Sequence, residues 1–227
     1  MTRIRFHQEL DELKHRILAM AGMAEQAIDL AVQAYSQRDL ALCERVLGNE
    51  SAINRAEREV DEFAIDLLAM QQPMAVDLRF ILAVIKINAD LERVGDQAVN
   101  IAQRVMHMVG MPAFELPVDI PAMASRVRAM VRDALRSFIE GDTELAKHVL
   151  EADDEIDRIN HEAFAALSAC MQAKPDCAVQ ALDALSIARN LERVADHATN
   201  IAEDVIFWTS GKDVRHGEHA ASHRHDG

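Results

Sequence analysis

The chain has 227 residues, enough for one large domain or two small ones with a sizeable core. Asp and Glu outnumber Lys and Arg by 38 to 24, and the formal charge of −14 argues against nucleic acid and against electrostatic docking on anionic lipid. The same charge is compatible with metal cations or a basic protein surface. Aromatic residues make up only 4%, and the remaining apolar residues are mostly good helix formers, so the composition favours helix.

The first half of the chain is predicted to form three helices. Apolar residues recur in steps of three and four across residues 6–37, which is helical spacing. Asp39 can cap a second helix that runs to about residue 71, where Pro73 ends it because proline cannot continue the hydrogen-bond ladder. A third helix is predicted from about residue 75 to 109.

The second half repeats this plan. A shorter helix is predicted over residues 121–140 and is broken by Gly141. Asp142 can cap the next helix, which runs to about residue 172, and the last is predicted over residues 178–208. Neither half shows the strict alternation of apolar and polar residues that is typical of a strand.

The proline-containing segment of residues 111–120 has no helical pattern and is predicted to be an interdomain linker. We therefore expect a first three-helix repeat over residues 1–110 and a second over residues 121–211. Residues 212–227 form a polar, histidine-rich tail that we expect to be disordered and to which we assign no role.

An internal repeat supports this division. Residues 90–102 align with residues 190–202 at an offset of 100, and nine of the thirteen positions are identical. The second helix of each half aligns at an offset of 103, which places Asp39 opposite Asp142. The sequence therefore predicts an all-α fold of two tandem antiparallel three-helix bundles related by duplication.

The cysteines and the N-terminus bear on the cellular compartment. Cys43, Cys170 and Cys177 form no CxxC pair and no nucleophile-like arrangement with histidine, so we expect packing in the core and a reducing compartment. The first residues lack the apolar core of a signal peptide, and no apolar run approaches the roughly 20 residues that span a bilayer. We expect a cytoplasmic protein without direct membrane insertion, one that can lie at the inner membrane through protein partners.

Both repeats carry an acidic stripe on their last helix. On a helical wheel the stripe lies roughly opposite the apolar side, so we expect it to point away from the core. Like charges four residues apart gain nothing by themselves, and packing does not explain why exposed residues stay identical after duplication. Carboxylate and amide oxygens suit hard metal cations, which makes a metal site the favoured interpretation. The stripe consists of Glu92, Asp96 and Asn100 in the first repeat and Glu192, Asp196 and Asn200 in the second.

The second helix of each repeat adds further oxygen ligands. Asp153 and Asp157 are four residues apart, and their equivalents in the first repeat are Glu50 and Asn54. Because the second set is the more acidic, we expect the first-repeat site to bind metal less strongly or to be occupied differently.

Two other interpretations stay open. A solvated acidic face on a purely structural scaffold is the simplest, because charged residues mostly lie outside. A carboxylate-bridged metalloenzyme or metal-storage bundle would need Glu-x-x-His on two helices, and only Glu12 and His15 fit that spacing. No GxSxG, HExxH or glycine-rich phosphate loop is present, so we expect no enzyme.

The two LERVxDxAxNIA motifs resemble those of the PhoU family of bacterial phosphate-signalling accessory proteins. The Gln72-Pro73 pair followed by Asp77-Leu78-Arg79 and the ending over residues 208–216 are also similar to that family, so the resemblance covers nearly the whole chain. It implies two pseudo-symmetric three-helix bundles whose E(D)xxxD motifs hold iron, zinc, manganese or magnesium in multinuclear clusters.

The resemblance also implies a function and partners. It implies a non-enzymatic negative regulator of the phosphate regulon, a homodimer that acts between the ATPase subunit of the Pst phosphate transporter and a PhoR-type sensor histidine kinase and modulates phosphate uptake. Asn54 departs from the family's pattern and puts full occupancy of the first cluster in doubt. The metal-ligand role carries over to Glu92, Asp96, Glu192 and Asp196, and with them to Asn100, Asn200, Asp153 and Asp157.

Overall fold

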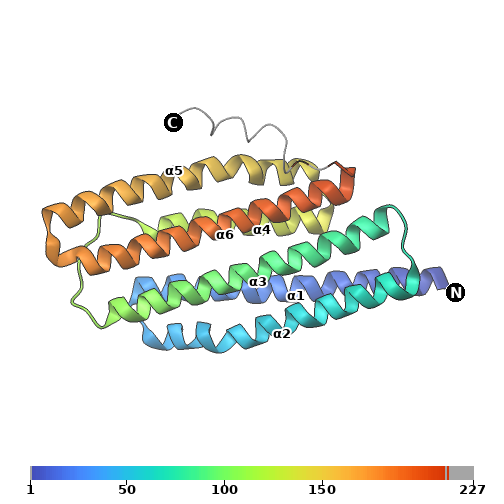
Figure 1. Ribbon diagram of the computed structural model, residues 1–227, viewed down its shortest axis with the longest axis horizontal. Helices are drawn as coiled ribbons and strands as arrows, with labels where there is room; N and C mark the ends of the chain where they lie inside the picture. Colours follow the sequence, from blue (N-terminus) through green and yellow to red (C-terminus); the bar gives the residue numbers. More distant parts are fainter. Residues whose placement is uncertain (1, 213, 215–227) are drawn as a thin grey trace.

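The computed structural model describes residues 2–212 and 214, so most of the predicted histidine-rich tail lies outside the described residues. The described residues form six α-helices, one short 3₁₀ helix and no strand, which confirms the predicted all-α fold (Figure 1). The helices are α1 (Thr2–Gln37), α2 (Leu40–Gln71), α3 (Val76–Val109), α4 (Ile120–Glu140), α5 (Thr143–Ala173), η1 (Pro175–Cys177) and α6 (Ala178–Ser210).

The helices form two three-helix bundles that lie side by side. Helices α1, α2 and α3 form one bundle and α4, α5 and α6 the other, and the last helices of the two bundles, α3 and α6, run antiparallel along the middle of the molecule (Figure 1). Helix α3 contacts α1, α2 and α6, and α6 contacts α3, α4 and α5. Each central helix is therefore covered by three neighbours.

The core runs through both bundles without a break. The apolar sides of the two central helices are fully buried, as the helical wheel predicted for Leu91 and Val94. Phe80 of α3 stacks on Phe138 of α4 with ring centroids 5.7 Å apart, and Trp208 of α6 packs edge-on against Phe80. Because these rings come from both repeats, the repeats share one hydrophobic core.

Aspartate residues cap three of the helices. Asp39 and Asp142 accept hydrogen bonds from backbone N–H groups in the first turns of α2 and α5, as predicted. Asp119 caps α4 in the same way, with Pro121 in its first turn, so α4 begins at Ile120, within the predicted linker. Gly141 ends α4 with a φ of 65°, a left-handed conformation that glycine adopts without strain.

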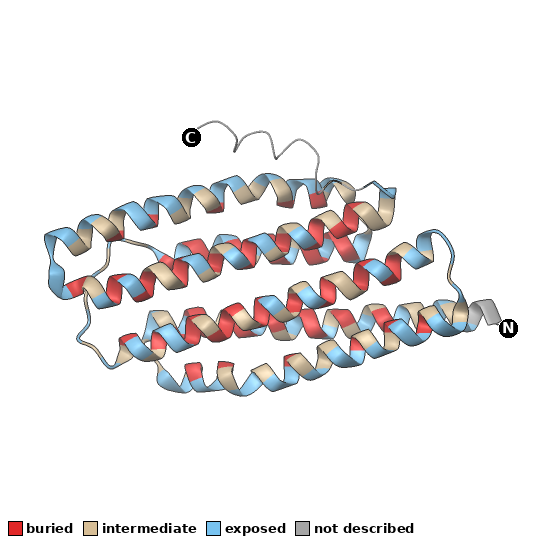
Figure 2. Cartoon of the chain, viewed as in Figure 1, coloured by how far each residue is buried: buried red, intermediate tan, exposed pale blue. Residues whose placement is uncertain are grey.

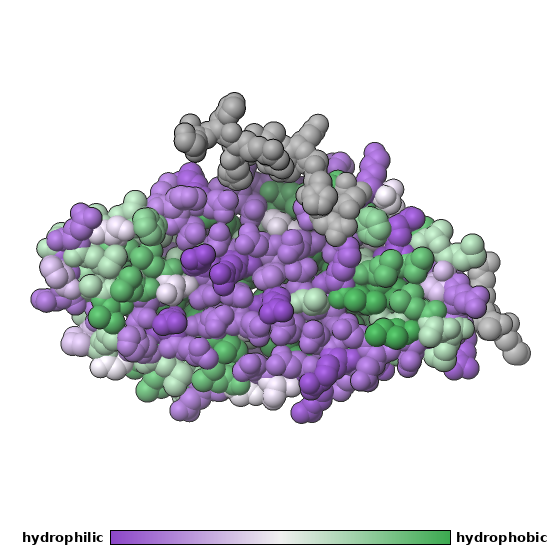
Figure 3. All heavy atoms as spheres, in the orientation of Figure 1, coloured by the Kyte–Doolittle hydropathy of each residue, from purple (hydrophilic) through white to green (hydrophobic). Residues whose placement is uncertain are grey.

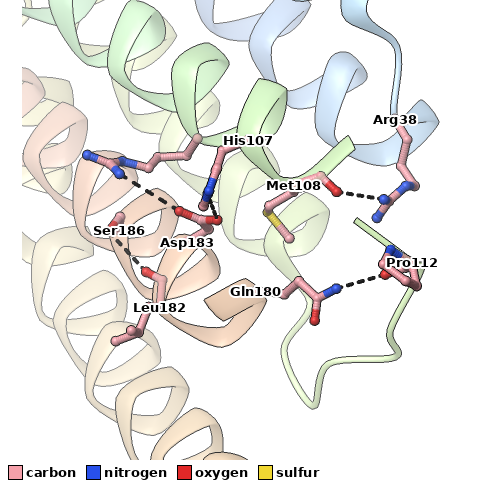
Figure 4. Close-up of polar contacts among 9 residues, drawn as sticks. Arg38, His107, Met108, Pro112, Gln180, Leu182, Asp183 and Ser186 are labelled. Atoms are coloured by element: carbon pink, nitrogen blue, oxygen red, sulfur yellow. Dashed lines mark hydrogen bonds and ion pairs between the residues drawn. The ribbon is translucent and has the colours of Figure 1, made fainter. Parts of the chain in front are cut away.

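The linker is held against both repeats. Residues 110–119 form no helix. The Arg38 guanidinium donates to the carbonyls of Met108, at the end of α3, and of Met111 in the linker, at 2.7 and 2.6 Å. The Gln180 amide of α6 donates to the carbonyl of Pro112 at 2.7 Å (Figure 4). The connection between the bundles is therefore fixed by hydrogen bonds from each of them.

The acidic stripe of the first repeat is less exposed than the wheel predicted. The Glu92 side chain is only 18% exposed and that of Asp96 33%. The expectation that the stripe points away from the core is therefore too simple for the first repeat, where α2 packs on α3, whereas Asp196 and Asn200 of the second stripe are exposed as expected. Intermediate burial alternates with full burial along both central helices (Figure 2).

The surface combines a polar middle with apolar ends. Polar side chains cover most of the face in Figure 3, and apolar side chains gather toward its two ends. Large exposed apolar residues include Met74 and Val76 where α2 joins α3, and Val179 and Leu182 at the start of α6. No helix in the described part of the chain is long and apolar enough to cross a membrane.

Replacing Phe138 by alanine should lower the free energy of unfolding by about 3–5 kcal/mol, because it removes a fully buried ring from the aromatic cluster that joins the repeats. Phe164→Ala on α5 is the matched control, since that ring is 63% exposed and should cost about 0.5 kcal/mol or less. Urea unfolding followed by circular dichroism measures both values. Equal losses in the two variants would contradict a core shared by the repeats.

Candidate metal centre

Helices α5 and α6 bring the predicted carboxylates of the second repeat together. Asp153 and Asp157 lie one turn apart on α5, and Glu192 and Asp196 lie one turn apart on α6. The charges of Asp157, Asp196 and Glu192 all raise the pKa of Asp153, which places these side chains within electrostatic reach of one another. The structure thus gathers these carboxylates from helices that the sequence alone could not place side by side.

Asp153 is the most perturbed member of this cluster. Burial, followed by the neighbouring carboxylates, raises its pKa to about 7, and its buried Oδ1 has no hydrogen-bond partner in the described structure. The pKa values of Glu192 and Asp196 are also raised, first by burial and then by the other carboxylates, although Arg193 partly offsets both. Several carboxylates therefore share a half-buried site at a free-energy cost.

A metal cation fits this donor set. A buried carboxylate oxygen without a donor, surrounded by further carboxylates, is what an oxygen-liganded cation neutralises. As they stand, no three His, Cys, Asp or Glu side chains of the described chain are arranged to hold one ion. Carboxylates repel one another when no cation lies between them, so the ligands would have to rotate inward when a cation enters.

The first repeat provides a different environment. The pKa of Glu92 is raised first by burial and then by Asp96, and Arg93 and His197 lower it. The Arg93 guanidinium lies 3.5 Å from Glu92 Oε2 and 3.6 Å from Asp96 Oδ2. This acidic pair therefore has a cationic side chain beside it, which partly neutralises the stripe.

The helix facing the first stripe contributes a residue that the sequence analysis did not select. Glu57 is the α2 carboxylate whose charge raises the pKa of Glu92. Glu50, which aligns with Asp153 of the second repeat, is not the residue that does so. Glu57 follows Asn54 by three positions and so continues the same face of α2, a spacing that could have revealed it. One turn further on, Asp61 accepts a hydrogen bond from the buried amide of Asn88 at 2.8 Å.

The two asparagines of the stripes take different positions. Asn200 donates from Nδ2 to Asp90 Oδ1 on α3 at 3.0 Å, so its amide is directed to the seam between the repeats. Asn100 is half-buried on α3, one turn after Asp96. The predicted ligand roles of both residues stay predictions.

His197 is a second residue that the sequence analysis did not select. Its Nδ1 lies 2.8 Å from Asp90 Oδ1 on the other central helix. Its charge lowers the pKa of Glu92 in one repeat and of Asp196 in the other, so it lies near both acidic stripes. The repeat comparison concealed it, because the first repeat has Gln97 at the aligned position.

The polar contacts of the single Glu-x-x-His match lie within its own helix and not at these carboxylates. Glu12 Oε1 is bound by Arg16 at 2.8 Å, and His15 Nδ1 contacts the carbonyl of Asp11 at 2.7 Å. Both interactions stay within one turn of α1, so they give no support to a di-iron carboxylate site.

A model of the PhoU domain family matches the chain twice, over residues 17–105 and 120–205. The curated relatives include the phosphate-specific transport system accessory protein PhoU homolog of Pseudomonas putida, 39% identical over 214 residues that cover 93% of this chain and 83% of the relative. The homolog of the same name from Aquifex aeolicus is 37% identical and covers 94% of this chain and 96% of the relative.

Solved structures show the same fold. The crystal structure of PhoU from Pseudomonas aeruginosa superposes with a TM-score of 0.87 at 35% identity, over 91% of this chain and all of that chain. The crystal structure of the phosphate transport system regulatory protein PhoU from Streptococcus pneumoniae gives a TM-score of 0.82 at 26% identity and covers 92% of this chain and 99% of that chain. These proteins are named as accessory or regulatory proteins.

Replacing Asp153 by asparagine should stabilise the metal-free protein at pH 8 by about 1–2 kcal/mol, after allowance for solvent screening, because it removes a half-buried charge from a cluster of carboxylates. The pKa of Asp153 is about 7 in the folded protein and has its ordinary value of 3.8 in the unfolded chain, so wild-type stability falls as the pH rises between these values. The gain should therefore be absent below pH 4 and complete above pH 7. Urea unfolding in the presence of a chelator measures it.

Asp154→Asn is the control for this experiment, because it removes the same charge from an exposed neighbour. Its effect should be smaller and should change less between pH 4 and pH 8. A stability gain of equal size in both variants would show that net charge, and not burial at Asp153, is responsible.

Proposed function

This chain belongs to the PhoU family, and we propose that it is a metal-binding regulatory adaptor of phosphate homeostasis. Family membership makes it an accessory protein of the phosphate transport system. We propose further that it is a negative regulator of the phosphate regulon, acting between the Pst transporter and a PhoR-type sensor kinase and modulating phosphate uptake.

The observation that carries the metal part of the proposal is the buried Oδ1 of Asp153, which lacks a hydrogen-bond partner in the described chain and lies among carboxylates from two helices. Asp153, Asp157, Glu192 and Asp196 would hold the cation through oxygen atoms, which suits magnesium, manganese or iron and also permits zinc. A bound cation would supply the positive charge that this site lacks and would link α5 to α6. The first-repeat site would bind more weakly, because α2 has the neutral Asn54 where α5 has Asp157.

The regulatory part of the proposal is supported by charge and surface. The net charge of −14 argues against an electrostatic nucleic-acid partner and is compatible with a basic protein surface. Exposed apolar residues where α2 joins α3 and at the start of α6 are available for protein contacts, which is consistent with a homodimer, a transporter ATPase subunit or a kinase as partner. These contacts would bring a cytoplasmic protein to the inner membrane without inserting it.

Metal binding should raise the melting temperature. At a manganese concentration about 100 times the dissociation constant, linkage predicts about 2.7 kcal/mol of added stability, which corresponds to roughly 5–10 °C for a chain of this size. Asp196→Ala should remove most of this shift, whereas Asp96→Ala, the equivalent change in the first repeat, should remove less. Differential scanning fluorimetry with Mn²⁺ or EDTA measures the shifts. Elemental analysis of untagged protein gives the metal content.

A melting temperature that is the same in Mn²⁺ and EDTA would contradict metal binding and favour a structural scaffold. Asp154→Asn is the matched control and should keep the full shift, because its side chain is exposed beside the site. Ferroxidase turnover by the iron-loaded protein would instead favour the metal-storage or metalloenzyme alternative.

Deletion of the gene in its host should switch on phosphate-regulon genes in phosphate-rich medium, because the proposed adaptor holds the kinase in its repressing state. A phosphatase reporter at high and low phosphate measures the effect. Complementation with wild type should restore repression, and the Asp196→Ala variant tests whether repression requires metal. Reporter activity that stays low in the deletion strain would contradict the regulatory proposal while leaving metal binding untouched.

A further inference from the structure

Two cysteine thiols lie next to each other where α5 turns into α6. Cys170 is near the end of α5 and Cys177 ends η1, and their Sγ atoms are 3.2 Å apart. The Lys174 N–H donates to the carbonyl of Cys170 at 2.8 Å, and the Cys177 N–H donates to the carbonyl of Lys174 at 3.1 Å. Both cysteines are therefore held through their own backbone, so the closeness of the thiols is built into the turn.

The two thiols have unequal access to solvent. Cys177 is fully buried in a small second core with Leu167 and Ala181, whereas Cys170 packs at the edge of that core and is partly exposed. Burial, together with the hydrogen bond to Cys170, raises the pKa of the Cys177 thiol. A small oxidant therefore reaches Cys170 first, and Cys177 keeps its proton until the neighbouring sulfur has reacted.

We propose that Cys170 and Cys177 are a peroxide-sensitive thiol pair that closes reversibly to a disulfide. The Cys170 thiol loses its proton and the thiolate attacks one oxygen of hydrogen peroxide, so that an S–O bond forms as the O–O bond breaks, and the released hydroxide takes up that proton and leaves as water. The Cys177 sulfur then attacks the Cys170 sulfenic acid, an S–S bond forms as the S–O bond breaks, and the proton of Cys177 leaves with the hydroxide as water. In sum, two thiols and one molecule of hydrogen peroxide give one disulfide and two waters.

The geometry demands little movement for this reaction. A disulfide bond is about 2.05 Å long, so the sulfurs, 3.2 Å apart, must approach by roughly 1 Å. Cys43, the remaining cysteine, is buried on α2 and directs its Sγ to the carbonyl of Asp39 in its own helix at 3.4 Å. Cys170 and Cys177 are therefore the two thiols of the described chain that lie close enough for one to react with the oxidised form of the other.

The thiol pair also lies beneath the linker between the repeats. Phe114 of the linker packs against the same small core, and Lys174 Nζ lies 5.6 Å from the centre of the Phe114 ring. At the aligned positions the first repeat has Leu67 and Asp77, so the pair is particular to the second repeat. A disulfide would fix the α5–α6 turn, against which the linker packs, and would leave the first repeat unchanged.

The test uses the full-length protein, reduced and then treated with a small excess of hydrogen peroxide. Intact mass should fall by 2 Da, and alkylation by N-ethylmaleimide under denaturing conditions should label one thiol in place of three. Both cysteines lie on the tryptic peptide of residues 159–189, because trypsin does not cleave between Lys174 and Pro175. That peptide should carry the loss of 2 Da, the melting temperature should rise by about 3–8 °C, and dithiothreitol should reverse both changes.

Variants assign the roles of the two sulfurs. Cys177→Ser should leave Cys170 as a sulfenic acid that dimedone traps, and Cys170→Ser should give no mass loss. Cys43→Ser is the matched control and should still lose 2 Da. The proposal is overturned if wild-type protein gains only oxygen atoms, forms only intermolecular disulfides or keeps three reactive thiols. The wild-type measurement decides this even if a variant fails to fold.

Discussion

The packing of α3 against α6 is the constraint on which the rest of the molecule depends. Each central helix is covered on three sides, so its polar residues must either find a partner or bear the cost of burial. Several do find partners across the seam. Lys86 lies 2.9 Å from Asp204, and His107 Nδ1 lies 2.6 Å from Asp183, whose side chain is only 6% exposed (Figure 4). Along this seam the buried carboxylates of Asp204 and Asp183 are matched with the cationic side chains of Lys86 and Arg104 from the opposite repeat.

The carboxylates between α5 and α6 lie in a different electrostatic environment. Asp153 has a buried oxygen without a hydrogen-bond partner in the described chain, and its nearest charged influences are other carboxylates. A protein that needed these residues only for packing would gain stability by pairing or replacing them. The contrast between matched carboxylates at the seam and unmatched ones beside α5 is therefore the physical basis for assigning a cation to this place.

The duplication preserved the central helices more closely than their outer partners. The LERVxDxAxNIA motif is common to both repeats, but α2 has Glu50 and Asn54 where α5 has Asp153 and Asp157. In the first repeat Glu57 takes the neighbouring position, and Arg93 lies beside the stripe. Equal motifs on the central helices thus produce unequal electrostatic environments, because the outer helix of each bundle decides how much negative charge is left without compensation.

The sequence by itself determined the six helices, the Asp39 and Asp142 caps and the duplication, because helix periodicity and capping depend on residues close along the chain. It also determined which residues could serve as oxygen ligands. Only the tertiary structure decided that the first stripe is half-buried, that Glu57 and His197 lie near the stripes, and that the Cys170 and Cys177 thiols meet across a turn. Those facts depend on which helix covers which side of another, and a helical wheel treats each helix as if it stood alone in water.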